Sequence, residues 1–214
     1  MRSSSAFLLT ALSFGSASVP SGGEVTPLER TLASAGFSEL GVTDGVTVYR
    51  DEESGIVRVA AEGEIDAAPA RVLEALVAYE RHPGAIERVC ESRVLERADG
   101  SLVVYQRLSL PIISDRDFVL RVEWGGSGDT TWVAYRAVTD AGPEEQDGIV
   151  RVKDHVGSWQ LRPARDGAAT RARYQMHVDL AGDLPAWMAG SHAGDEIPAL
   201  FAAIGRLARA TGGE

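Results

Sequence analysis

The chain has 214 residues, 44% of them hydrophobic and 24% charged, which fits one globular domain with a short extra segment. Its formal net charge of −10 argues against nucleic acid as a partner and against purely electrostatic docking on anionic lipid. The single cysteine, Cys90, excludes an intrachain disulfide, and we expect it to be a small buried hydrophobe.

The N-terminal segment has the features of an export signal. Arg2 supplies a positive charge, residues 6–14 form a short apolar run, and residues 15–18 are small, as at a cleavage site. The run is too short to span a bilayer. We therefore expect a signal peptide at 1–20, a linker at 21–26 and the folded domain at 27–210. The protein is then exported (periplasmic or secreted); without a functional signal it is cytoplasmic.

The first part of the domain predicts a short helix, a hairpin and a second helix. The first helix covers 27–35, and the hairpin joins 46–49 to 56–65, both rich in β-branched residues. The second helix covers 66–79, with Asp66 as its N-cap, Pro69 in its first turn and an apolar stripe at helical spacing.

The rest of the chain predicts a run of strands followed by a long final helix over 185–210. Glycine-containing turns such as Asp99-Gly100 separate the strands, so consecutive strands are antiparallel. The fold class is therefore α+β, with helices packed on a strongly curved antiparallel sheet. The expected strands are 89–97, 102–110, 115–124, 130–138, 149–161 and 170–180.

Three segments resemble the START family (steroidogenic acute regulatory protein-related lipid transfer domains). Residues 114–119 read Ser-Asp-Arg-Asp-Phe-Val, residues 157–163 resemble the family's penultimate strand, and residues 179–188 resemble the entry into its final helix. The resemblance covers about 65–207. It implies a helix-grip fold, in which a curved antiparallel sheet wraps around a long C-terminal helix and encloses a lipid-sized apolar cavity.

Alternating patterns indicate which faces of the strands are dry. Apolar residues at 172, 174, 176 and 178 alternate with polar ones, and similar faces occur at 104–108, at 118–124, and at Val150, Val152 and Val156. The same residues could pack as an ordinary core; the resemblance favours a cavity lining. The expected ligand-binding residues are Val104, Gln106, Leu108, Phe118, Leu120, Val122, Tyr135, Val152, Tyr174, Met176, Met188, Ile197, Phe201 and Ile204.

The pairing of the expected strands 115–124 and 130–138 decides whether an arginine faces inward. Pairing of Trp124 with Thr131 turns Val133 and Tyr135 to the dry side, whereas pairing with Trp132 turns Arg136 there. We expect the first register, because an unpaired inward arginine costs several kcal/mol. The buried acid and base that sterol-binding relatives often carry correspond here to Gln106 and Val122, which argues against a sterol, although Gln106 can still bond a hydroxyl or ester oxygen.

The segment Leu110, Pro111, Ile112 and Ile113 places apolar residues in a connecting loop, and we call it the gate loop. It is expected either to form the cavity mouth and dip into a bilayer or to pack under the final helix. Gly190, Gly194 and Pro198 interrupt that helix, which suits a hinge.

These patterns predict a monomeric carrier of a lipid or other hydrophobic small molecule, with transient membrane contact and no nucleic acid. The chain has no nucleophile elbow, phosphate-binding loop or zinc-protease motif, so no catalytic residue, cofactor or metal is expected. His155 and His177 could be neighbours, but His177 is expected to face water. The alternatives are a polyketide cyclase that uses Arg136 and Tyr174 in the same cavity, and a ligand-free adaptor with a filled core.

Overall fold

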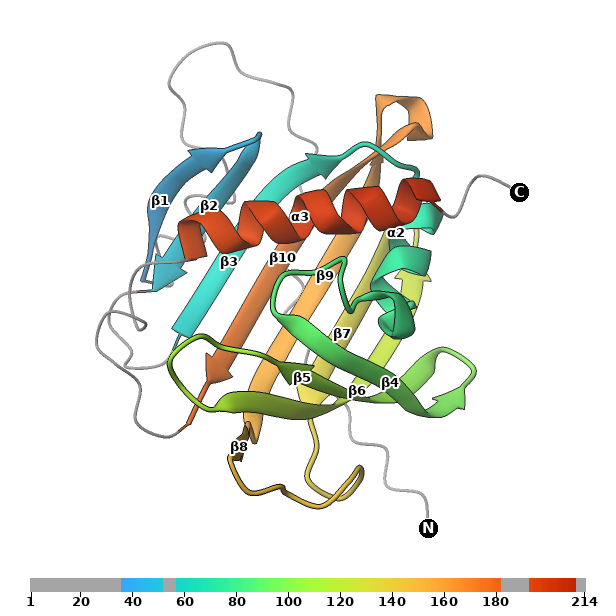
Figure 1. Ribbon diagram of the computed structural model, residues 1–214. Coiled ribbons are helices and arrows are strands. Elements are labelled where there is room, and N and C mark those ends of the chain that lie inside the picture. Colours follow the sequence, from blue (N-terminus) through green and yellow to red (C-terminus); the bar gives the residue numbers. More distant parts are fainter. Residues whose placement is uncertain (1–35, 52–56, 182–192, 211–214) are drawn as a thin grey trace.

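The structure is a computed structural model that describes residues 36–51, 57–181 and 193–210. The expected signal peptide, the linker, the helix over 27–35, Met188 and Gly190 lie outside the described residues. Within the described part, ten strands form one sheet in the order β1-β2-β3-β10-β9-β7-β6-β5-β4, with β8 paired to β6. The sheet curves around helix α3, so the expected helix-grip fold is confirmed (Figure 1).

The strands and helices have the following bounds. The strands are β1 (Phe37–Thr43), β2 (Val46–Asp51), β3 (Val57–Ile65), β4 (Val89–Ala98), β5 (Ser101–Leu108), β6 (Asp115–Ser127), β7 (Thr130–Ala137), β8 (Ile149–Arg151), β9 (Asp154–Ala164) and β10 (Ala169–Asp179). The helices are α2 (Pro69–Val77), α3 (Ala193–Ala210) and two short 3₁₀ helices, η1 (Tyr79–Arg81) and η2 (Arg165–Gly167).

Helix α3 lies across the concave face of the sheet and beside α2 (Figure 1). Its apolar residues recur at helical spacing, and Ile197, Phe201 and Ile204 are buried in the main core. The Phe201 ring packs on Trp159 of β9, with ring centroids 5.0 Å apart. A Cβ at Gly63 of β3 would lie 3.3 Å from the same ring, so this glycine lets α3 approach the sheet closely.

The structure corrects four details of the sequence interpretation. Strand β1 was not expected, and Cys90 is exposed on β4 rather than buried. Asp66 does not cap α2, which begins at Pro69 after Ala68; its carboxylate instead pairs with Arg165 at 2.9 Å. Pro198 does not interrupt α3, which continues from Ala193 to Ala210 although the proline cannot donate to the carbonyl of residue 194.

The expected single strand over 149–161 is two strands. Residues 152 and 153 separate β8 from β9, and the backbone N–H of Val152 donates to the carbonyl of Asp117 at 2.9 Å. The break shifts the alternation. Val152 is buried as expected, but Val156 is 48% exposed and does not belong to the dry face. His155 takes the inward place instead.

A buried ion pair fastens β8 to β6. Asp117, 1% exposed, accepts two hydrogen bonds from the Arg151 guanidinium, at 2.7 and 2.9 Å, and Arg151 is 7% exposed. Arg116 is also buried, and its guanidinium donates to the carbonyls of Leu180 and Ala181 just after β10. The Arg-Asp pair of the START-like segment therefore holds the neighbouring chain segments in place.

Replacing Asp117 with alanine should destabilise the fold strongly, because it leaves the Arg151 guanidinium buried without its carboxylate. We expect a loss of about 3–5 kcal/mol in the free energy of unfolding, measured by urea denaturation. The control is Glu80→Ala, which removes the exposed pair between Glu80 and Arg97 and should cost less than about 1 kcal/mol. Equal losses in the two variants would contradict the structural role of the buried pair.

Candidate functional site

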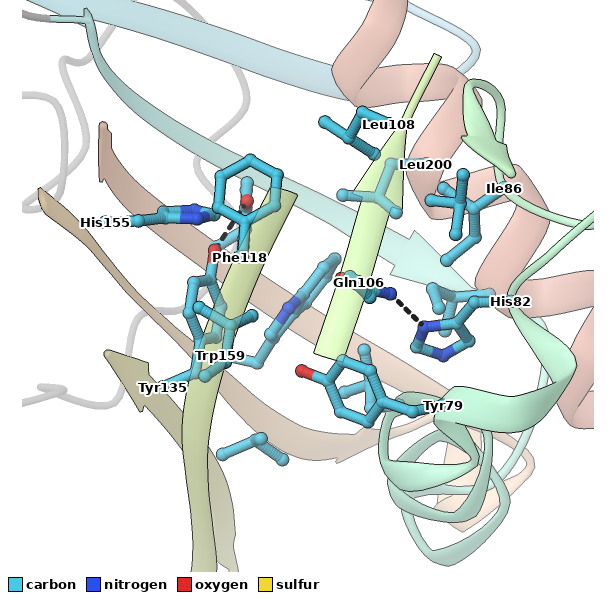
Figure 2. A pocket seen from close by; sticks show the side chains of 16 residues that line it. Tyr79, His82, Ile86, Gln106, Leu108, Phe118, Tyr135, His155, Trp159 and Leu200 are labelled. Carbon is cyan, nitrogen blue, oxygen red and sulfur yellow. Dashed lines mark hydrogen bonds between the residues drawn. The ribbon is translucent and has the colours of Figure 1, made fainter. Parts of the chain in front are cut away.

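A cavity of about 170 Å³ lies between the concave face of the sheet, the chain that follows α2, and α3 (Figure 2). Strands β4, β5, β6, β7, β9 and β10 form one wall, and α3 contributes to the other. The lining is mainly apolar and aromatic. It consists of Leu76, Tyr79, His82, Ile86, Val89, Gln106, Leu108, Phe118, Leu120, Val133, Tyr135, His155, Trp159, Tyr174, Leu200 and Ile204.

The structure brings half of the expected ligand-binding residues to this cavity. The residues that line it are Gln106, Leu108, Phe118, Leu120, Tyr135, Tyr174 and Ile204. A second group belongs to the surrounding core without lining the cavity: Val104, Val122, Val152, Ile197, Phe201 and the partly buried Met176. For the residues of both groups, a role in ligand binding stays a prediction.

The faces of β7 are as expected, although the register differs by two residues. Trp124 pairs with Val133 rather than Thr131, because only two residues separate the paired Ser127 and Thr130 at the turn. A shift of two residues keeps the same side chains inward, so Val133 and Tyr135 line the cavity. Arg136 pairs with Arg121 and Val156 on the other face, so the pair of Arg136 and Tyr174 considered for the alternative cyclase function does not form in the cavity.

Sequence reasoning missed several lining residues. Tyr79, His82 and Ile86 come from the chain after α2, a stretch in which no ligand-binding residue was expected. His155 and Trp159 come from β9, where the break after β8 hid the alternation. The aromatic and apolar residues at the end of the predicted second helix and just after it were the available signal for the first group.

His82 and Gln106 form a buried polar pair at one side of the cavity (Figure 2). The Gln106 side-chain amide donates to His82 Nδ1 at 3.2 Å, and His82 Nε2–H donates to the carbonyl of Ala75 at 3.1 Å. This arrangement uses the neutral imidazole, since protonation of Nδ1 would break the bond from Gln106. Burial lowers the pKa of His82 to about 4.

Two tyrosines form a second polar group deep in the cavity. The hydroxyls of Tyr135 and Tyr174 are 2.9 Å apart, and the Tyr174 hydroxyl donates to Met176 Sδ at 3.3 Å. Burial raises the pKa of Tyr174 to about 12 and the pKa of Tyr135 well above its usual value, so both hydroxyls are neutral. A Cβ at Gly157 would overlap the Tyr135 ring, so this glycine makes room for the pair.

The gate loop connects β5 to β6 beside the cavity strands. Leu110 is buried, whereas Ile112 is 89% exposed and has a φ of 77°. Pro111 is exposed and Ile113 is half-buried. This φ lies in the left-handed region, which is unfavourable for a β-branched residue. Because most of the Ile112 side chain is open to solvent, the expectation that the loop packs under the final helix fails for this residue.

Comparison with known proteins identifies the family. The family model described as polyketide cyclase / dehydrase and lipid transport matches residues 65–204. The chain belongs to this family. An uncharacterised protein of Pseudomonas aeruginosa is 29% identical over 153 residues, which are 69% of this chain and 74% of that protein.

Two solved structures have the same fold. The STAR-related lipid transfer protein of Xanthomonas axonopodis superposes with a TM-score of 0.73 and 28% identity, over 81% of this chain and 99% of that chain. Human STARD10 superposes with a TM-score of 0.72 and 16% identity, over 87% of this chain and 81% of that chain. The resemblance to START domains is therefore confirmed, and it holds for the fold.

Neither a metal centre nor a membrane span is found in the described residues. No group of His, Cys, Asp and Glu side chains among them could hold a metal ion. His177 lies on the outer face of β10 and pairs with Asp154 at 3.2 Å. Neither helix in the described ranges combines the length and the apolar character needed to cross a bilayer.

Protein stability should fall as the pH drops from about 6.5 towards 4. The unfolded His82 has an ordinary pKa near 6.5, whereas the folded one has a pKa of about 4, so the unfolded chain binds the proton in this window. His82 alone contributes about 3 kcal/mol to the change. Urea denaturation at several pH values should show a shallower dependence for His82→Gln, with the remainder from His155. Equal slopes for wild type and variant would contradict this assignment.

Proposed function

We propose that this protein binds a lipid or similar hydrophobic molecule in the cavity and transfers it between membranes. The observation that carries the proposal is the mainly apolar cavity between the curved sheet and α3. Such cavities with a few convergent polar groups are the usual form of small-molecule sites. Membership of a family described by polyketide cyclisation and lipid transport supports the same proposal.

Binding of a whole lipid requires the cavity to widen. Its volume is about 170 Å³, whereas pockets for drug-sized ligands measure roughly 300–1,000 Å³. A cavity of about 150 Å³ holds only a molecule such as benzene. We infer that α3 moves relative to the sheet when a ligand enters, because Leu200 and Ile204 project from α3 into the cavity.

The magnitudes suit a carrier. Burial of about 400 Å² of apolar ligand surface gives about 10 kcal/mol at roughly 25 cal/mol per Å². Association and ordering remove several kcal/mol of that gain. A membrane stabilises the same ligand by a similar amount, so the net free energy of exchange is small and the ligand can move in either direction.

We also propose that the gate loop touches the membrane during transfer. Ile112 extends from the loop with most of its side chain exposed, beside the buried Leu110. The Ile112 side chain can enter the acyl region of a bilayer, where its apolar surface is favoured. The net charge of −10 leaves such apolar contact as the means of docking.

Filling the cavity should abolish ligand binding without unfolding the protein. Val133 lines the cavity, so Val133→Phe places a ring in the space that the ligand needs. Native mass spectrometry after incubation with lipid vesicles should show at least about a tenfold drop in the ligand-bound fraction. A drop of this size corresponds to the free energy lost when the ligand's apolar contacts are removed. The matched control is Val156→Phe on the exposed face, which should bind as wild type does. Equal ligand occupancy in both variants would place the ligand elsewhere.

A charge at the tip of the gate loop should slow transfer and leave binding intact. Ile112→Asp places a carboxylate where the side chain would enter hydrocarbon, which is unfavourable. We expect about a tenfold or greater drop in the rate of lipid transfer between vesicles, with an unchanged bound fraction. Val42→Asp, at an exposed position of β1, is the control and should transfer at the wild-type rate. An unchanged rate for Ile112→Asp would exclude this loop as the docking element.

A second candidate function is cyclisation of a polyketide in the same cavity. A neutral imidazole, His155, lies beside the Tyr135 ring in the lining, and such groups can move protons. Incubation with a synthetic poly-β-ketone should then yield a product lighter by one water. Recovery of the unchanged compound from the complex would leave carriage as the function.

A further inference from the structure

His155 is a polar side chain of the cavity lining whose hydrogen-bonding groups have no partner in the described part of the chain. Both of its ring nitrogens are buried, and neither has a hydrogen-bond partner in the part of the chain that the structure describes. The ring lies between Phe118 and Tyr135, with centroid distances of 5.0 Å to each (Figure 2). Both neighbouring rings fix its orientation at the cavity wall.

A buried imidazole without a partner is unfavourable. Leaving a buried donor or acceptor unbonded costs about 1–3 kcal/mol for each group. His82, on the other side of the cavity, avoids this cost through its bonds to Gln106 and Ala75. His155 lies in the cavity lining, so the group that can satisfy it is a water molecule or the polar part of a ligand.

The imidazole of His155 is neutral at ordinary pH. Burial lowers its pKa to about 4; the nearby Asp154 acts to raise this pKa and His177 acts to lower it. A neutral imidazole offers one N–H donor and one nitrogen acceptor. A hydroxyl group can bond to both kinds of nitrogen, and an ester or amide carbonyl can accept from the N–H.

The described lining of the cavity carries no charge that would stabilise a charged head group. Among the described lining residues there is no Asp, Glu, Lys or Arg. The other polar groups are also neutral, since burial raises the pKa values of Tyr135 and Tyr174. An ionised carboxylate or phosphate moved from water into these surroundings would remain unpaired, at a cost of several kcal/mol.

We propose that His155 hydrogen-bonds the polar group of an uncharged amphiphile, such as a long-chain alcohol, ester or amide, and thereby selects it over ionised lipids. This inference rests on the proposed binding function. It assigns to His155 the role of a specificity-determining residue, placed at the wall formed by β6, β7 and β9.

Competition binding separates this inference from the proposed function. The uncharged fluorescent probe N-phenyl-1-naphthylamine reports on the cavity, and decanol, methyl decanoate and decanoate compete for it at neutral pH. Wild type should bind the alcohol and the ester at least about tenfold more tightly than the carboxylate. His155→Phe should weaken decanol binding about tenfold relative to its binding of the probe, the size of one neutral hydrogen bond.

Two further variants complete the test. His155→Gln keeps a donor and an acceptor and should retain decanol binding within about threefold of wild type. His177→Phe makes the same substitution on the outer face of the neighbouring strand and should match wild type for every competitor. Decanol binding that is unchanged in His155→Phe, or decanoate binding as tight as decanol binding in wild type, would overturn the inference. Failure of the wild type to bind the probe or any competitor would overturn the proposed function itself.

Discussion

The packing of α3 on the concave sheet is the contact on which the rest of the structure depends. Phe201 is at its centre, with its ring against Trp159 on one side and the small Gly63 on another. Full burial of such a side chain contributes about 1.5–3 kcal/mol. The contact holds α3 at one height above the sheet, and that height sets the volume of the cavity beside it. Widening the cavity therefore requires these aromatic contacts to shift.

The polar groups of the cavity are of two kinds: those that have hydrogen-bond partners within the protein and those that have none. His82 is held by Gln106 and by a backbone carbonyl, so it supports the chain between α2 and β4. The hydroxyls of Tyr135 and Tyr174 bond to each other. His155 alone among the described lining residues keeps two buried nitrogens open. The described lining thus combines polar groups that support the fold with His155, the group proposed to recognise the ligand, and none of these lining side chains is charged.

The sequence predicted those parts of the fold that follow a regular period. The alternation along β10 and the apolar stripe of α3 placed Tyr174 and Ile204 correctly, since one face of each element is dry. The prediction failed where the alternation of inward and outward side chains is interrupted. Residues 152 and 153 shift the alternation, which exposed Val156 and brought His155 inward. Strand β1 is an edge strand whose residues are mostly exposed, so it has no dry face to reveal it.

The pairing of β3 with β10 has a consequence for how the chain folds. Ile65 pairs with Thr170 and Val57 with Val178, so two central strands meet only after most of the chain has been made. Contacts between residues so distant in sequence form slowly, because a long loop must close before they are gained. Until then the apolar faces of the early hairpin and α2 stay uncovered. A chaperone that shields these segments during synthesis would therefore protect them from aggregation until β10 is made.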